Sequence, residues 1–262
     1  VQDIVVTARK RAENVQDIPV SIRAVDAETI QRQDISGLEK LAAKAPELII
    51  ARSSNGSGAS LTIRGVGSNF SSVGVEQSVA VIVDGAYYGH GRTIDEGFFD
   101  LARVEVLKGP QALFFGKNAT AGVISITTAD PGDAFEGLAK VGYEFRSQSV
   151  YAEAVASGPI SDTLGIRVAL RGSKMYGGYT KNRATQAFYN TIDVATGNVA
   201  ALAAAPADRD QPGTKDLIGR VTLKWTPTED LTNTLKISGT HSRGGASGFS
   251  TILGCAGPFG QR

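Results

Sequence analysis

The chain has 262 residues, 42% of them hydrophobic, and its 27 Lys and Arg residues nearly balance its 26 Asp and Glu residues, giving a formal net charge of +1. This composition is typical of a chain that buries a core, and it excludes a largely disordered chain. Nucleic-acid binding needs a clear cationic excess, so the charge balance gives no support for a nucleic-acid partner.

The N-terminal segment, residues 1–14, contains a β-prone run at residues 3–8, Asp-Ile-Val-Val-Thr-Ala, followed by three basic residues. A run of this kind beside a charged stretch can add as a strand to the edge of a partner's sheet, where main-chain hydrogen bonds hold it. It can also be an ordinary edge strand of this chain. The basic residues are typical of a solvated terminal segment.

Residues 15–131 combine two short helical segments with several strands. The segments 26–33 and 36–44 begin with Asp or Ser and have Glu shortly afterwards, the pattern of a helix start. Apolar runs between clusters of Gly, Asn and Asp predict strands at residues 18–25, 61–64, 79–83, 103–107 and 123–127. The combination predicts an α+β domain of roughly 130 residues.

The pattern changes near residues 129–133, and residues 132–262 contain stretches in which apolar and polar residues alternate. These stretches are residues 140–146, 164–171, 220–225 and 234–238. In the second of them, Arg167 and Arg171 fall on the face opposite to Leu170. Such strands fit a transmembrane barrel with lipid outside and a wet lumen inside. An ordinary antiparallel sheet with one face in water produces the same alternation.

The connections between these strands favour the barrel. The connection at residues 147–148 is tight, those at 158–163 and 226–230 are short, and residues 174–215 form a long stretch without predicted structure. Short turns at every second connection are typical of the periplasmic end of a barrel, and long loops of its outer end. The chain has no run of roughly 18 apolar residues, so we expect no membrane-spanning helix.

The sequence gives no support for catalysis or for a bound metal or cofactor. The histidines are His90 and His241, the single cysteine is Cys255, and no nucleophile stands in an elbow-type turn. The stretch 109–118 lacks the glycine and the hydroxyl residue that a phosphate-binding loop requires at fixed positions. Cys255 is either a lone thiol or the partner of a cysteine beyond Arg262. We therefore expect a protein that is not an enzyme.

Residues 100–128 read Asp-Leu-Ala-Arg-Val-Glu-Val-Leu-Lys-Gly-Pro-Gln-Ala-Leu-Phe-Phe-Gly-Lys-Asn-Ala-Thr-Ala-Gly-Val-Ile-Ser-Ile-Thr-Thr. This stretch resembles the end of the plug domain of TonB-dependent outer-membrane receptors at nearly every position. Other landmarks of that family stand in the right order, with the TonB box at 3–8, Ile-Arg-Gly at 63–65 and Val-Asp-Gly at 83–85. The resemblance implies an α+β plug domain followed by antiparallel β strands of a partial, truncated transmembrane β-barrel of roughly 22 strands.

The resemblance also implies roles for three sets of residues. TonB would bind the box, which consists of Asp3, Ile4, Val5, Val6, Thr7 and Ala8. The ligand would meet two plug apices, which carry Ser68, Asn69, Phe70, Tyr87, Tyr88, His90 and Arg92. Rings and donors of this kind suit an anionic ligand, although loop aromatics can equally be packing anchors. A lock to carboxylates on the barrel wall, which we expect on strands beyond Arg262, would involve Arg64, Arg103, Glu105 and Lys108, unless Glu105 neutralises these cations within the plug.

The function implied by the resemblance is energy-coupled uptake of a scarce ligand, usually a ferric siderophore. TonB, energised from the inner membrane, would displace the plug within the barrel lumen. The receptor would lie among the lipids of the Gram-negative outer membrane, with its N-terminus in the periplasm. Alternatives are uptake of cobalamin, a carbohydrate or an aromatic compound, and a non-transporting binding or adhesion module. Since five strands leave open edges that hydrocarbon does not tolerate, we expect the chain to be part of a longer receptor.

Overall fold

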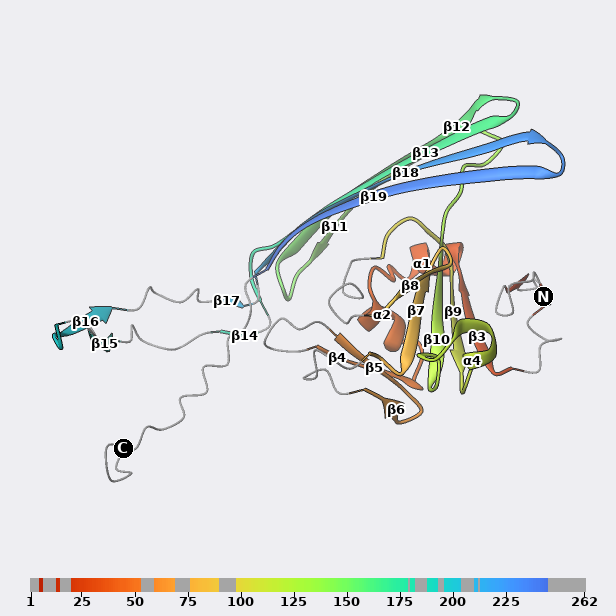
Figure 1. Ribbon diagram of the computed structural model, residues 1–262. Helices are drawn as coiled ribbons and strands as arrows, with labels where there is room; N and C mark the ends of the chain where they lie inside the picture. Colours follow the sequence, from red (N-terminus) through yellow and green to blue (C-terminus); the bar gives the residue numbers. More distant parts are fainter. Residues whose placement is uncertain are drawn as a thin grey trace.

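The structure is a computed structural model that describes residues 5–6, 13–14, 20–52, 59–68, 76–89, 98–178, 180–181, 188–192, 196–203, 210–211 and 213–244. Two bodies are visible in Figure 1: an α+β body, here called the plug, and a long antiparallel sheet lying across it, here called the wall. The plug comprises the described residues between 20 and 131, and the wall those between 136 and 244. None of the helices in the described part of the chain is long and apolar enough to cross a membrane.

The larger sheet of the plug has the strand order β3-β9-β10-β7-β8, with bounds Ile22–Asp26, Leu101–Lys108, Gly122–Thr128, Val79–Val83 and Ala86–Tyr88. Strand β10 runs parallel to β7 and antiparallel to β9. Along β7, Val79 and Val81 enter the apolar cluster on one face of the sheet. Ala80 and Ile82 enter a second cluster on the other face. Burial on both faces explains why this strand is apolar throughout.

Two helices complete the main core of the plug. They are α1 (Ala27–Arg32) and α2 (Leu38–Ala42), which confirm the two expected helical segments in slightly shorter form. Asp26 begins α1 because its carboxylate accepts a hydrogen bond of 2.8 Å from a backbone amide of the first turn. Ile30 from α1 and Leu41 from α2 then bury their side chains against the sheet.

The plug also contains a second sheet with the order β4-β5-β6, whose bounds are Leu48–Arg52, Ala59–Ile63 and Val66–Gly67. Strand β5 confirms the strand expected at residues 61–64, whereas β4 and β6 were not predicted. Strand β4 was not expected, because its short apolar run shows no alternation; its pairing with β5 places it in a sheet. The helix labelled α4, Ala112–Phe115, forms a single turn in the glycine-rich stretch between β9 and β10.

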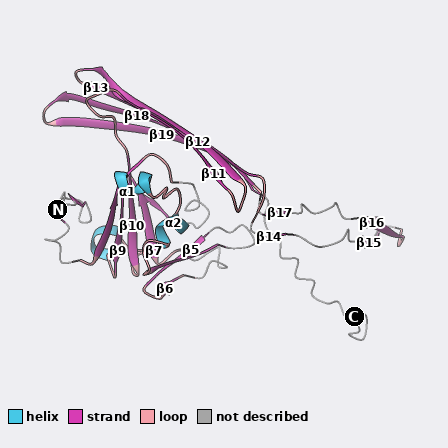
Figure 2. Ribbon diagram, turned by 180° about the vertical axis from the view of Figure 1, so that it is seen from behind, coloured by secondary structure: helices cyan, strands magenta, loops and turns pink. Residues whose placement is uncertain are grey.

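The wall is an antiparallel sheet with the order β11-β12-β13-β18-β19, whose bounds are Glu136–Glu144, Ser149–Ser161, Leu164–Met175, Thr214–Thr228 and Leu231–Gly244. The turns at 162–163 and 229–230 lie at one end of this sheet, and the long connection between β13 and β18 extends from the other (Figures 1 and 2).

The expectation that residues 174–215 lack structure is wrong for part of that stretch. It contains two short antiparallel pairs, β14 (Thr180–Lys181) with β17 (Asp210–Gln211) and β15 (Phe188–Ile192) with β16 (Val199–Ala203). These pairs follow the last wall pairing of β13 with β18, Lys174 opposite Lys215, so main-chain hydrogen bonding continues beyond the sheet.

The two faces of the wall differ as the alternation predicted. The outward face leaves large apolar side chains exposed, among them Val141, Tyr143, Leu170, Val221, Trp225, Leu235 and Ile237. The opposite face carries Lys and Arg side chains that contact the plug. An ordinary sheet with one face in water would instead expose its charged side and bury its apolar side.

Candidate functional site at the contact between plug and wall

The inward face of the wall presents three consecutive rows of side chains to the plug, each row crossing all five strands. The first row consists of Glu136, Ser157, Arg167, Thr222 and Lys236. The second consists of Leu138, Val155, Ala169, Arg220 and Ser238. The third consists of Lys140, Glu153, Arg171, Ile218 and Thr240. The plug therefore faces a surface with cations in every row and an apolar centre.

Asp100, which directly precedes β9, binds the first row. The Arg167 guanidinium donates from Nε to both carboxylate oxygens at 3.0 Å and from Nη2 to Oδ1 at 2.6 Å. The side chains are 11% and 3% exposed, so this two-pronged ion pair is shielded from water. Glu136 approaches the same guanidinium at 3.7 Å from its other side. Removing either member of the central pair would leave a buried charge without compensation.

Phe99 anchors the plug in the second row. Its ring forms an apolar cluster with Val155, Ala169 and Ile218, and Leu138 packs against them. Its neighbour Phe98 points the opposite way and enters the plug core. Consecutive residues of an extended segment face opposite sides, so this dipeptide joins the two bodies.

Asp84 forms a second polar contact with the first row. It lies in the turn between β7 and β8, and its carboxylate accepts hydrogen bonds from the backbone N and Oγ1 of Thr128 at 3.0 and 2.7 Å. Lys236 donates to Asp84 Oδ1 at 3.1 Å and to Thr128 Oγ1 at 2.8 Å. Asp130 completes the cluster, 2.8 Å from the same ammonium group. Lys236 thus bridges the turn and the end of β10.

Asp34 contacts the third row. It follows α1, pairs with Lys40 within the plug, and accepts a hydrogen bond of 3.2 Å from Lys140 of the wall. Burial raises the pKa of Asp34, but the hydrogen bonds and charges of the two lysines outweigh this effect, so the pKa lies below its ordinary value. The carboxylate therefore stays ionised through the neutral range.

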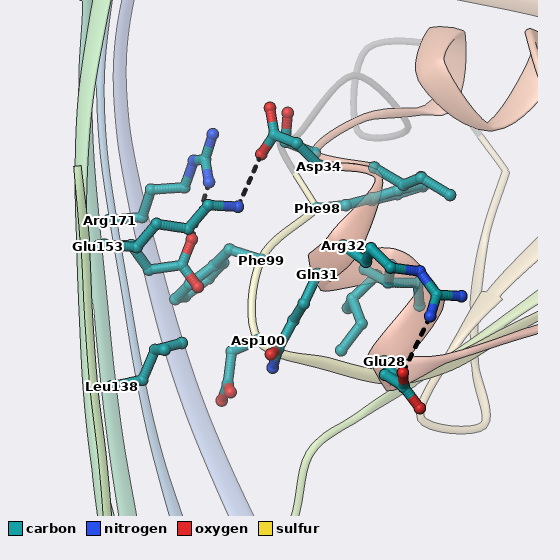
Figure 3. A pocket seen from close by; sticks show the side chains of 15 residues that line it. Glu28, Gln31, Arg32, Asp34, Phe98, Phe99, Asp100, Leu138, Glu153 and Arg171 are labelled. Atoms are coloured by element: carbon teal, nitrogen blue, oxygen red, sulfur yellow. Dashed lines mark hydrogen bonds and ion pairs between the residues drawn. The ribbon is translucent and has the colours of Figure 1, made fainter. Parts of the chain in front are cut away.

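A cavity of about 370 Å³ separates α1 from the wall beside this contact. Figure 3 shows Glu153 and Arg171 on the wall side of the cavity and α1 with Glu28 and Arg32 on the plug side. Arg171 pairs with Glu153 at 2.8 Å, and Arg32 with Glu28 at 3.0 Å. Each of these charges is thus compensated within its own body.

The four residues expected to form the lock make contacts inside the plug. Arg103 lies 3.0 Å from Glu105, which is fully buried, and Lys108 lies 2.7 Å from Glu47. Arg64 donates to Ser21 Oγ at 3.3 Å. The alternative, that Glu105 neutralises the cations of β9 within the plug, thus has a geometric basis for Arg103. A lock to carboxylates of other barrel strands stays a prediction.

The two expected ligand apices are described only in part. Ser68 Oγ accepts from the backbone N of Ser78 at 2.9 Å, and Asn118 Nδ2 donates to Tyr87 Oη at 2.7 Å. Burial raises the pKa of Tyr87, and the Asn118 contact only partly opposes this shift. Tyr88 packs against the main core, as a packing anchor would. The remaining apex residues, Asn69, Phe70, His90 and Arg92, lie outside the described residues.

The expected TonB box is also described in part. Val5 and Val6 form strand β1, which pairs antiparallel with β2, Glu13–Asn14. The other four residues of the box, Asp3, Ile4, Thr7 and Ala8, lie outside the described residues. The box thus contains backbone in an extended conformation, which is the form that can add to a partner's sheet.

Comparison with known proteins gives a consistent assignment. The family TonB-dependent Receptor Plug Domain matches residues 14–123. The pesticin receptor of Yersinia pestis is 30% identical over 227 residues, which cover 86% of this chain and 30% of that protein. The hemin receptor of Yersinia enterocolitica is 31% identical over 134 residues, covering 50% of this chain and 18% of that protein. The crystal structure of the ferric yersiniabactin uptake receptor FyuA from Yersinia pestis matches with a TM-score of 0.65 and 25% identity, over 85% of this chain and 32% of that chain.

The chain thus spans less than a third of the length of these relatives. A small α+β body seated on the charged face of an antiparallel sheet is the arrangement of a plug domain beside the strands that follow it. The chain belongs to the TonB-dependent receptors, and residues 14–123 are its plug domain.

Proposed function

We propose that this chain supplies the plug and the first wall strands of a closed outer-membrane barrel that takes up an iron complex, in the first place a ferric siderophore. Support comes from the names of its relatives, which include a hemin receptor and a ferric yersiniabactin uptake receptor. The plug would close the lumen until TonB pulls on the N-terminal segment. No bond of the ligand is made or broken in this function.

The observation that carries the proposal is the inverted polarity of the wall. Its outward apolar side chains are exposed and the cations that face the plug are shielded, an arrangement that is stable when lipid surrounds the apolar face. The 12 residues of β13 span about 40 Å along the strand at ~3.3 Å per residue. At a strand tilt of about 45° this length crosses roughly 28 Å, close to the apolar band of an outer-membrane barrel.

Aromatic side chains mark both ends of this outward face. Trp225 is exposed near the turn at 229–230, and Tyr143 and Phe145 are exposed at the opposite end, with their ring centroids 5.1 Å apart. Aromatic girdles at the two membrane interfaces are typical of transmembrane barrels. The turns at 162–163 and 229–230 lie at the Trp225 end, which we assign to the periplasm, and the N-terminal segment would face the same compartment.

The TonB step can be tested with a peptide. A peptide of residues 1–14 is titrated with the periplasmic C-terminal domain of TonB, beside the same peptide carrying Val5→Pro. Proline removes a main-chain donor, so the variant should lose binding if residues 3–8 add as a strand. Ala12→Pro, which places the same change outside the box, is the matched control and should retain binding. Absence of binding by the unmodified peptide would refute coupling through this segment.

The ligand class can be tested in the complete receptor. Cells that depend on this receptor for iron are supplied either with ferric siderophores of several chemical types or with hemin. We expect growth on a siderophore, and the hemin arm examines the second candidate that the relatives suggest. Truncation of Tyr87 to Ala should then weaken uptake if the described apex meets the ligand. Growth on neither iron source would contradict the proposal.

A further inference from the structure

We infer that Asp34, Asp84 and Asp100 form one docking surface by which the plug recognises its seat on the first wall strands. Each carboxylate is bound by a cation on a different strand: Lys140 on β11, Arg167 on β13 and Lys236 on β19. Two of these cations stand in the first row and one in the third, so the three contacts do not lie on a line. Three such points fix both the position and the tilt of the plug.

The three aspartates share an unusual backbone conformation. Their φ angles are 48°, 48° and 52°, in the left-handed region. Among the described residues, the other non-glycine residues with positive φ are Arg64 and Gln148. Asp, Asn and Gly tolerate this conformation best, and of these only Asp carries a charge. Asp34 and Asp84 stand in turns and Asp100 in the bend directly before β9, so each carboxylate lies where the chain changes direction beside the wall.

The three contacts differ in their exposure to water. The Asp100 pair with Arg167 is buried and has two-pronged geometry, whereas the Asp84 and Asp34 pairs are partly exposed. Burial makes the first contact costly to break, and water screens the other two. Loss of the Asp100 carboxylate should therefore cost more than loss of either outer one, while the outer contacts select the orientation of the plug.

The charge pattern of this surface is opposite to that of the expected lock. In the lock, plug cations would meet carboxylates of other barrel strands, whereas here plug carboxylates meet cations of the wall. Arg103 and Lys108 are engaged with Glu105 and Glu47 within the plug. The docking surface is therefore a separate set of residues, and its effect can be measured without the lock.

The reporter for the test is Thr222, which stands in the first row between Arg167 and Lys236 and is 1% exposed. Thr222→Cys is introduced into the complete receptor in a background in which Cys255 and every cysteine beyond Arg262 are replaced by Ser, so that position 222 carries the single thiol. The rate of maleimide labelling of the purified receptor, without ligand or TonB, then reports how often the plug leaves its seat. Because neither partner is present, the result is independent of the proposed uptake function.

Asp100→Asn keeps a residue that tolerates positive φ and removes the charge, so it tests the carboxylate alone. We expect labelling on the order of 100-fold faster, since the buried Arg167 loses its compensating charge. Asp84→Asn and Asp34→Asn should give a smaller rise of about 2- to 5-fold, diminished by salt. Asp133→Asn, a change of an exposed aspartate between plug and wall, is the matched control and should label at the parent rate.

A double variant, Asp100→Asn with Arg167→Gln, should label no faster than Asp100→Asn alone, because the unpaired cation is gone. If Asp100→Asn does not assemble, Asp84→Asn and Asp34→Asn test the inference by the increase in their labelling rate and by its salt dependence. Labelling at the parent rate in Asp84→Asn and Asp34→Asn, or strictly additive effects in the double variant, would overturn the inference.

Discussion

Arg220 of the wall lies over the ring of Phe99 of the plug, with the guanidinium carbon 4.8 Å from the ring centroid. Its Nη1 also donates to the carbonyl oxygen of Phe99 at 3.2 Å. One wall cation therefore contacts both the side chain and the backbone of the residue that anchors the plug. Such a stacked arginine is worth more where water is excluded, as it is here.

Phe99→Ala should destabilise the seated plug by about 3–5 kcal/mol, because it removes a buried ring and leaves a cavity in the second row. Phe145→Ala removes the same side chain from an outward position that is 84% exposed, and it should have little effect on the plug. Thermal unfolding of both variants measures the difference. Equal midpoints would show that Phe99 does not hold the two bodies together.

Gly122→Ala should prevent the plug from folding normally. This glycine begins β10 with φ of 157°, and an added Cβ would lie 2.4 Å from the carbonyl oxygen of Leu107 and 2.8 Å from Ile63. The first of these neighbours is backbone on the paired strand, which cannot move away without breaking the sheet. Gly137→Ala, where an added Cβ meets no atom within 4 Å, is the control. Protease resistance of the plug distinguishes the two.

Glu105→Gln should cost about 3–5 kcal/mol of plug stability, because Glu105 is fully buried beside Arg103. The exposed pair of Lys117 and Glu76 offers a comparison, since Lys117 is 82% exposed and Lys117→Gln should cost less than ~1 kcal/mol. Chemical denaturation followed by circular dichroism gives both values. A small loss for Glu105→Gln would indicate that Arg103 finds its main partner elsewhere, as the predicted lock to the wall requires.

Acid should loosen the contact between Asp34 and Lys140. The pKa of Asp34 is lower in the folded protein than in the unfolded chain, so its stabilising contribution is present above the unfolded value and is lost as the pH falls through the folded value. We therefore expect this contribution to begin to decline below about pH 4 and to be lost at still lower pH. The melting temperature of Asp34→Asn should fall less steeply with acid than that of the parent, and parallel profiles would contradict this assignment.

Local patterns predicted much of the fold. The Asp at the start of α1 and the alternation of β13 and β18 depend on residues close together in the chain, so their signals can be recognised without tertiary information. Strand β4 and the strand pairs beyond β13 gave no such signal. Their hydrogen bonds depend on partners that the chain brings alongside only when it folds.

For the contact between plug and wall, the sequence predicted which residues lie on the polar face but not which residues pair. Alternation indicated that Arg167 and its neighbours occupy a polar face, and the family landmarks included Asp84 within its turn. The sequence did not indicate that Asp84 meets Lys236, 152 residues away, or that Asp100 meets Arg167, 67 residues away.

The sequence by itself determined three features: the change from an α+β pattern to alternating strands near residues 129–133, the face on which each wall strand carries its charges, and the family landmarks of the plug. These features follow from the period of a strand and from short motifs, which are local properties. Only the tertiary structure decided which cations oppose Asp34, Asp84 and Asp100, and that Arg103 pairs with Glu105 within its own strand. Charge attraction is not specific to one partner. Each pairing is therefore set by which aspartate the folded plug places beside each row of the wall.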